Sequence, residues 1–225
     1  QRLEKYADGK SEKPKYVGTF GDEDRRDNLQ LRTLQSCLRI TYTSPKTMHW
    51  ITLVLKEVLE DESCDLIEIL EDYCRSKVEQ SDFEQASGFG FERIVFTYLD
   101  YLLFKNGYSY KRKKLISPLN PNWIFQFRNS IEHFYPQHPE NGEEWEAGDL
   151  HCFGNLSLIT VSGNAKFSNL PPIGKIKAYP RIVEQSLKLK IMKELTELDD
   201  AGWTVEKARE HQAEMFKLLK RDLAR

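Results

Sequence analysis

The sequence predicts an α+β protein that is mainly helical, in which a short β-containing segment separates two helical parts. Apolar residues recur at helical spacing through most of residues 27–104. This spacing is lost and β-favouring residues appear over residues 121–161, and helical spacing returns from residue 181 onward. We therefore expect a helical bundle over residues 1–120, a distinct core unit over residues 121–180, and C-terminal helices over residues 181–225 that pack on that core.

The composition is typical of a folded protein without a membrane span. With 40% hydrophobic and 30% charged residues, the chain holds enough apolar material for one substantial core or two small ones. No stretch reaches the roughly 20 apolar residues of a membrane-spanning helix, and residues 1–28 lack the apolar core of a secretory signal. We therefore expect a cytoplasmic protein whose four cysteines (Cys37, Cys64, Cys74 and Cys152) are reduced and mostly buried.

Four helices are expected in the first half of the chain. The helical spacing over residues 27–60 is interrupted at Pro45, which predicts two helices packed antiparallel to each other. A third helix is predicted over residues 64–78, and a fourth, strongly apolar helix over residues 91–104, where Gly107 follows as a stop signal.

The second half begins with an irregular segment around Pro121. Residues 123–135 then carry several β-favouring side chains, and the apolar run over residues 152–161 suits a short strand or one arm of a hairpin. Two final helices are predicted over residues 181–198 and 204–223.

The formal net charge of −2 conceals an uneven distribution of charge. Residues 1–100 hold 14 basic and 20 acidic side chains, whereas residues 101–131 hold six basic side chains and no acid. Residues 132–149 hold six acids and no Lys or Arg, and residues 150–183 hold four basic side chains and no acid. Two cationic stretches that bracket an acidic one suit a polyanion near a cation-binding centre, although solvated loops would give the same pattern.

Cations in these two stretches are candidates for contacts to nucleic-acid phosphates. In the first stretch, Tyr108 and Tyr110 lie beside a run of basic residues, as is common on nucleic-acid surfaces, but a solvated linker explains the run equally well. The predicted contacts are Lys111, Arg112, Lys113, Lys114, Lys166 and Lys175.

Three short segments carry the pattern that points to chemistry. The chain reads IEHFYPQ at residues 131–137 and LHCFGNLSLIT at residues 150–160, and Asn164 follows Asn155 after nine residues. This pattern resembles the His-Asn-His, or ββα-metal, nuclease motif (HNH). More narrowly, it resembles the C-terminal nuclease domain of the GmrSD-type restriction endonucleases and of the related phosphorothioate-sensing nickases of the Ssp defence system.

The resemblance implies a ββα-metal unit within residues 121–180 and divalent-metal-dependent cleavage of DNA, as nicks or double-strand breaks, in restriction of phage or modified foreign DNA. Enzymes of this family join the nuclease domain to a ParB-like NTPase domain. The resemblance therefore also implies that the chain is the C-terminal part of a longer bacterial or archaeal protein and works with that sensor domain. Whether one subunit or a homo-oligomer makes the cut is left open.

The resemblance also implies a role for each motif residue. Glu132 and Asn164 would bind one Mg²⁺ or Mn²⁺, since carboxylate and amide oxygens suit hard cations. His133 would be the general base, and the Asn155 amide would bind backbone across the two arms. In an extended segment Glu132 and His133 point to opposite faces, so their convergence on one phosphate requires a bend or a backbone carbonyl. Secondary candidates are His151 and Asn169.

Two alternatives to this assignment remain at the level of sequence. Arg128 and His133 match the short Arg…His signature of the all-helical, metal-independent HEPN ribonucleases, which requires both residues on one helix. The other alternative is a helical module that binds a partner or DNA and carries an inactive HNH-like centre.

Overall fold

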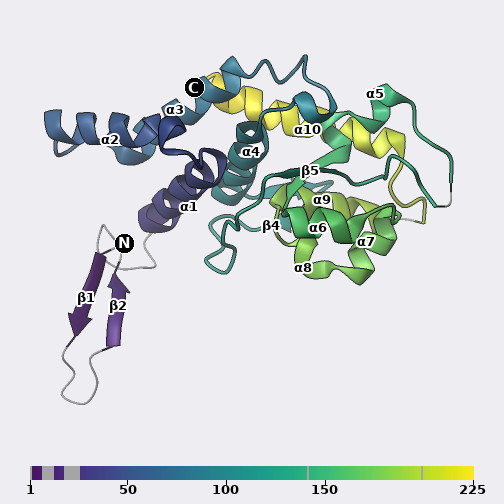
Figure 1. Cartoon of the computed structure of the whole chain (residues 1–225), viewed down its shortest axis with the longest axis horizontal. Helices are drawn as coiled ribbons and strands as arrows, with labels where there is room; N and C mark the ends of the chain where they lie inside the picture. The colour runs from purple at the N-terminus through teal and green to yellow at the C-terminus, as the bar shows by residue number, and fades with distance from the viewer. Residues whose placement is uncertain (1, 7–12, 18–25, 141, 199) are drawn as a thin grey trace.

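The computed structural model describes residues 2–6, 13–17, 26–140, 142–198 and 200–225. Within them the chain is mainly helical, with three separate two-stranded sheets (Figure 1). The predicted fold class, α+β and mainly α, is confirmed. In Figure 1 helices α1 to α3 lie toward one end of the molecule and helices α5 to α8 toward the other.

The four helices predicted in the first half are present. They are α1 (Arg26–Thr41), α2 (His49–Glu60), α3 (Leu66–Gln80) and α4 (Arg93–Asn106), with short 3₁₀ turns η1 (Pro45–Thr47) and η2 (Gly88–Gly90) between them. Two short strands that no sequence pattern indicated, β1 (Arg2–Tyr6) and β2 (Lys13–Val17), pair antiparallel before α1.

Helices α1 and α2, which were expected as an antiparallel pair, do not pack closely against each other. Helix α1 packs on α3 and α4, whereas α2 packs on α3 and extends to the edge of the molecule (Figure 1). The Pro45 turn between them is capped by the Ser44 hydroxyl, which accepts a hydrogen bond from the Lys46 amide. Because Leu34 and Leu38 of α1 are fully buried, this helix is held by the core and not by its neighbour along the chain.

Helix α4 forms the centre of the core. Every residue from 94 to 104 is buried, and the apolar side chains cover all sides of the helix, as in helices enclosed by others. The buried apolar residues of α4 belong to one hydrophobic cluster, to which every other helix except α5 also contributes. The proposed division into three units is not tested by this packing and stays a prediction.

The second half alternates short strands and helices. Its elements are β3 (Tyr108–Tyr110), β4 (Lys113–Ile116), β5 (Ser130–His133), α5 (Ala147–Leu150), the 3₁₀ turn η3 (Phe153–Asn155), β6 (Leu156–Ile159), α6 (Val161–Phe167), α7 (Pro172–Ala178), α8 (Pro180–Val183), α9 (Leu187–Thr196) and α10 (Val205–Leu223). Strands β3 and β4 form an antiparallel hairpin, which was not predicted from the sequence.

The single helix predicted over residues 181–198 is two helices, α8 and α9. Ser186 separates them, because its hydroxyl accepts a hydrogen bond from the Leu189 amide and so begins a new helix. The buried carboxylate of Asp100 in α4 accepts hydrogen bonds from the Ser186 hydroxyl at 3.2 Å and the Lys188 amide at 2.8 Å. A tertiary contact therefore fixes this break.

The described residues bear on the expected absence of a membrane span and on the expected state of the cysteines. No helix among them has the length and apolar character that crossing a bilayer requires. All four cysteines are free thiols, of which Cys37 and Cys74 are buried.

Candidate functional site

The motif segments form a strand, a second strand and a helix in that order. Strand β5 pairs antiparallel with β6, with Glu132 opposite Ser157 and His133 opposite Leu156. All four residues of β6 are buried, which fixes this short strand by its apolar side chains. Helix α6 follows directly, begun by the Thr160 hydroxyl, which accepts a hydrogen bond from the Gly163 amide at 3.1 Å.

Asn155 joins the two arms of this unit through its side chain. Its Oδ1 accepts hydrogen bonds from the Tyr135 amide at 2.8 Å and from Trp203 Nε1 at 3.1 Å. Its Nδ2 donates to the carbonyls of Tyr135 at 3.1 Å and Leu150 at 2.9 Å. The predicted bonding of this amide to backbone across the arms is confirmed, and the fully buried side chain has its donors and acceptors paired.

Gly154 allows helix α10 to pack against the turn that carries Asn155. A β-carbon on Gly154 would lie 1.8 Å from the carbonyl oxygen of Ala208 in α10, far inside van der Waals contact. Only a residue without a side chain permits this approach. Helix α10 therefore packs on the turn that leads into β6, and Trp203 just before α10 reaches Asn155.

His133, at the end of β5, is buried and bonded to a second histidine. Its Nε2 lies 2.9 Å from Nδ1 of His151, and the two rings meet edge to face. Burial, aided by the nearby His151 and Lys175, lowers the pKa of His133 to about 4. The imidazole is therefore neutral at pH 7, which is the state a general base needs.

Glu132 is buried and paired with a buried lysine. Nζ of Lys175 donates to Glu132 Oε1 at 2.7 Å and to the carbonyls of His133 at 2.6 Å and Phe134 at 3.1 Å. Burial raises the pKa of Glu132, and the Lys175 ammonium opposes that rise. Three oxygen acceptors surround Nζ, which matches the three donors of a charged ammonium, so we take this pair as ionised.

The prediction that Lys175 contacts a DNA phosphate is therefore wrong. Its side chain has no exposed surface, and its ammonium group is enclosed by oxygen atoms of the protein. Lys175 is instead the counterion of Glu132, and its ammonium group also binds the backbone carbonyls of His133 and Phe134.

Asn164 lies on the Glu132 side of β5. Its Nδ2 donates to the hydroxyl of Ser130 at 2.8 Å, and Ser130 shares a strand face with Glu132 because side chains alternate along a strand. Asn164 Oδ1 and Glu132 Oε2 have no hydrogen-bond partner among the described residues. Two oxygen atoms that could bind a metal ion are therefore present at this junction of strand and helix. The part of the chain that the structure describes contains no cluster of three or more His, Cys, Asp or Glu side chains arranged around a metal position.

The structure does not show the bend or free backbone carbonyl that the convergence of Glu132 and His133 on one phosphate was expected to require. The strand directs the two side chains to opposite faces, and the His133 carbonyl, which could have served on the Glu132 side, is bonded to Lys175. His151 is the residue brought directly to His133, and its own carbonyl accepts a hydrogen bond from the Gly88 amide at 2.9 Å.

The other predicted contacts to DNA lie apart from this centre or at its edge. Lys111 and Arg112 form the turn between β3 and β4, and Lys113 pairs with Glu194 of α9 at 3.0 Å. Lys166 is exposed on α6, and Asn169 is exposed just after that helix. Lys114 is also exposed. Contacts from these basic residues to DNA stay predictions, and so does the place of Asn169 as a secondary candidate for the site.

The HEPN alternative is wrong. His133 is in a strand, and Arg128 precedes it in a segment without helical structure. Arg128 is fully buried, with its Nη2 2.6 Å from Asp100 Oδ2, and its guanidinium group is 5.0 Å from the Phe125 ring centroid. The two residues therefore do not share a helix face, and Arg128 belongs to the core.

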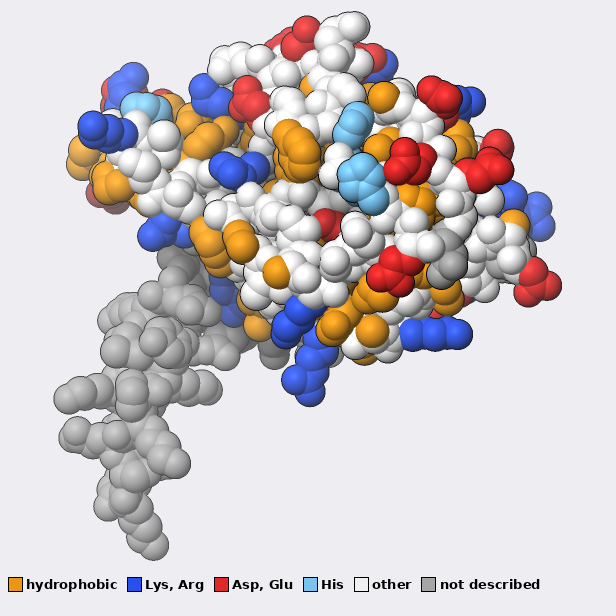
Figure 2. All heavy atoms as spheres, turned by 45° about the vertical axis from the view of Figure 1, so that its right-hand side comes forward, with side chains coloured by type: hydrophobic (Ala, Val, Ile, Leu, Met, Phe, Trp, Pro, Cys, Tyr) orange, Lys and Arg blue, Asp and Glu red, His pale blue; other side chains and the backbone are white. Residues whose placement is uncertain are grey.

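The surface on this side of the molecule has mixed charge. Figure 2 shows histidine side chains near the middle of the face, acidic side chains grouped beside them, and Lys and Arg scattered toward the edges. His138 and Glu144 are an exposed pair at 3.1 Å in the acidic loop after β5. A broad cationic surface is not visible in this view, in keeping with the near-neutral net charge.

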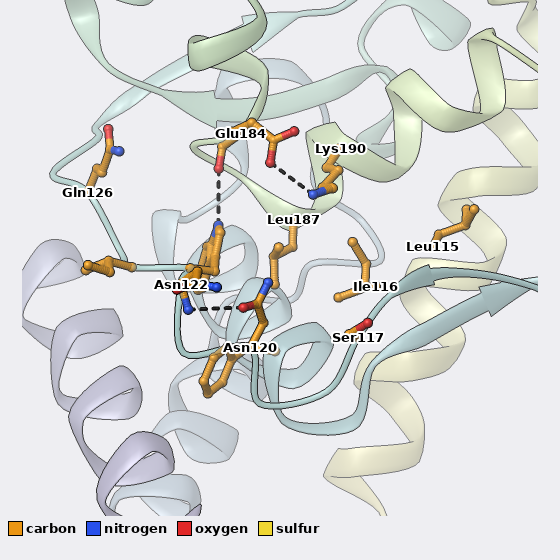
Figure 3. Close-up of a pocket in the computed structure, with 12 residues that line it drawn as sticks. Leu115, Ile116, Ser117, Asn120, Asn122, Gln126, Glu184, Leu187 and Lys190 are labelled. Atoms are coloured by element: carbon orange, nitrogen blue, oxygen red, sulfur yellow. Dashed lines mark hydrogen bonds and ion pairs between the residues drawn. The ribbon is translucent and has the colours of Figure 1, made fainter. Parts of the chain in front are cut away.

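A pocket of about 380 Å³ lies between the segment after β4 and helix α9, and sequence reasoning missed it (Figure 3). Trp123 Nε1 donates to the Glu184 carbonyl at 3.1 Å, and Glu184 pairs with Lys190 at 3.0 Å at this pocket. None of the motif residues lines it. The segment that precedes β5 is thereby fastened to α8 and α9, which fixes where β5 begins.

Comparison with known proteins identifies the family. The model of the family described as "GmrSD restriction endonucleases, C-terminal domain" matches residues 77–218, more than half of the chain. The chain belongs to this family. The GmrSD C-terminal match runs from the end of α3 almost to the end of α10, and so includes β5, β6, α6 and every residue of the motif.

This membership confirms the resemblance to the GmrSD-type C-terminal domain and supports a nuclease, a hydrolase that acts on DNA. No curated protein and no solved structure matches the chain.

Proposed function

We propose that this GmrSD C-terminal domain is a divalent-metal-dependent DNA endonuclease of the HNH type, with β5, β6 and α6 as its ββα-metal unit. The observation that carries the proposal is the pairing of a buried, neutral His133 with His151 on one face of β5, while Glu132 and Asn164 lie on its other face. The proposed setting is the cytoplasm of a bacterium or archaeon, where the domain would act on phage or modified DNA as part of a longer protein with a ParB-like NTPase domain.

In this proposal His133 takes the proton of the attacking water at its Nδ1. Nε2 is engaged with His151, so Nδ1 is the nitrogen left for this task when the Nε2 proton is donated to His151 Nδ1. His151 would thus fix the tautomer and orientation of the base. Asn155 would hold the chain after β5, through its bonds to Tyr135, so that His133 keeps its place.

Glu132 and Asn164 are the proposed ligands of one Mg²⁺ or Mn²⁺. Their Oε2 and Oδ1 atoms are hard oxygen donors on the side of β5 that α6 covers, which fits such a cation. The bound ion would offset the negative charge that develops on the leaving oxygen. Lys175 would position the Glu132 carboxylate through Oε1.

A second candidate is a partner-binding or DNA-binding module with an inactive centre. The observation that favours it is the Lys175 ammonium, which already neutralises Glu132 and bonds the His133 carbonyl. A cation bound at Glu132 would be repelled by the nearby Lys175 ammonium group.

A plasmid-nicking assay with Mg²⁺ or Mn²⁺, with and without EDTA, distinguishes the two candidates. We expect nicking that EDTA abolishes, and we expect His133→Ala to reduce the rate at least about a hundredfold, a typical contribution of a general base. His138→Ala is the matched control, because this histidine is exposed and paired only with a loop carboxylate. Absence of metal-dependent nicking in the unaltered chain supports the inactive module, and undiminished nicking by His133→Ala removes His133 as the base.

A further inference from the structure

A short turn before α4 lies against the His133 and His151 pair. The Gly90 amide donates to the Ser87 carbonyl at 2.9 Å, which closes the turn, and the Gly88 amide donates to the His151 carbonyl at 2.9 Å. Gly88 has φ of +56°, and a β-carbon there would lie 3.4 Å from the His151 ring. The turn is therefore anchored on His151 and has one conformation that favours glycine at this position.

Phe89 is the tip of this turn, and its ring is presented to solvent beside the proposed base. The side chain is 66% exposed, and its ring centroid lies 5.6 Å from that of His133, at an interplanar angle of 86°. Single exposed apolar side chains are common on protein surfaces, so the exposure of Phe89 by itself does not indicate a binding site. The distinguishing features are the anchored backbone on either side of the ring and its contact with His133.

We propose that Phe89 stacks on a nucleobase next to the phosphate that His133 serves. This inference rests on the proposed function and adds to it a substrate class. Aromatic rings bind nucleic acid by stacking on base faces, and those faces are open only where a base has left the helical stack. The preferred substrate at this site is therefore DNA with an unstacked base, as in a single strand or a distorted duplex.

The position of the ring supports a substrate contact over a purely structural role. An edge-to-face contact with His133 occupies one side of the Phe89 ring, and two thirds of the side chain faces solvent. Because hydrogen bonds of the turn hold the backbone on either side of Phe89, little backbone freedom is lost when a base stacks on the ring.

A binding experiment without cleavage tests this inference. The probe is a single-stranded oligonucleotide that contains 2-aminopurine, whose fluorescence is quenched by stacking, and the protein is the full chain with His133→Ala. We expect quenching on binding. We expect Phe89→Ala to remove it and to weaken binding about tenfold, in the range that one stacked base contributes, whereas Phe89→Trp retains both. Phe127→Ala is the matched control, since Phe127 is 58% exposed and precedes the opposite end of β5.

The inference is overturned if Phe89→Ala binds and quenches like its parent, or if it weakens binding no more than Phe127→Ala does. A change in nicking rate without any change in binding would also overturn it, because that result makes Phe89 a cover for His133 only. The nicking assay tests the proposed function separately: stacking in a chain that never nicks refutes the enzyme and leaves a DNA-binding site, whereas nicking without stacking refutes only the inference about Phe89.

Discussion

Gly154 shows how a single residue sets the position of the motif. The closest atom to a β-carbon at this position would be a backbone carbonyl of α10, which cannot rotate away as a flexible side chain would. The neighbouring Asn155 then bonds both the chain after β5 and the last residue of α5. The glycine and the asparagine of the GNL sequence therefore act through packing and hydrogen bonding, and neither needs to touch a substrate.

We expect Gly154→Ala to lower the free energy of unfolding by about 3 kcal/mol, the upper part of the usual range for overpacking, because α10 must move to admit the methyl group. Urea unfolding followed by circular dichroism measures this change. Gly148→Ala in α5 is the control, since nothing lies within 4 Å of a β-carbon there, and we expect it to be neutral or slightly stabilising. Equal stability of the two variants would show that α10 does not pack tightly on the motif turn.

At the scale of elements, the buried carboxylate of Asp100 connects three parts of the chain. It pairs with Arg128 from the segment before β5, and it bonds the Ser186 hydroxyl and the Lys188 amide at the start of α9. Helix α4 is in this way joined to both the approach to β5 and the break between α8 and α9. The strand that carries Glu132 and His133 is thus positioned by the core, and not only by its pairing with β6.

We expect Asp100→Ala to lower the free energy of unfolding by about 3–5 kcal/mol, because it leaves the fully buried guanidinium of Arg128 without its counterion. Thermal or urea unfolding measures the effect. Asp72→Ala provides the comparison. Asp72 pairs with Arg75, and the Asp72 side chain is largely exposed, so this ion pair contributes at most about 1 kcal/mol to stability. A loss no greater than that of Asp72→Ala would mean that Arg128 finds water or another partner.

Considered as a whole, the molecule encloses several ionisable groups under the motif turn. Burial lowers the pKa of Lys188 to about 7, and its Nζ bonds the Leu156 carbonyl at 2.5 Å. His211 of α10 is buried, neither ring nitrogen has a hydrogen-bond partner, and burial, together with nearby Lys188, lowers its pKa well below the ordinary value. Burial penalises the charged forms of Lys188 and His211, so both groups lower the free energy of unfolding under conditions in which they are charged.

The pH dependence of stability should therefore report on His211. A histidine whose pKa is lowered by folding contributes most above its unfolded pKa of about 6.5, and that contribution is lost as the pH falls toward the folded value. We expect the melting temperature to drop between pH 7 and pH 5, and His211→Leu to reduce that drop while keeping the fold at pH 7. An unchanged pH dependence in His211→Leu would assign the drop to other groups, such as His133.

The sequence determined the parts of this protein whose physical cause is local. Helical periodicity and stop signals predicted α1 to α4 and α10, and apolar runs predicted the strand segments of β5 and β6. The motif itself was sufficient to indicate the family, which the match over residues 77–218 confirms. Residue types at fixed spacing carry this information without any knowledge of contacts.

The tertiary structure decided how those residues are used, because the contacts join positions that no local pattern connects. Lys175 reaches Glu132 across 43 positions of the chain, and His151 reaches His133 across 18. A count of charges assigned Lys175 to a phosphate, and only burial revealed it as the counterion of Glu132. Free energy depends on the surroundings of each charge, and those surroundings exist only in the folded chain.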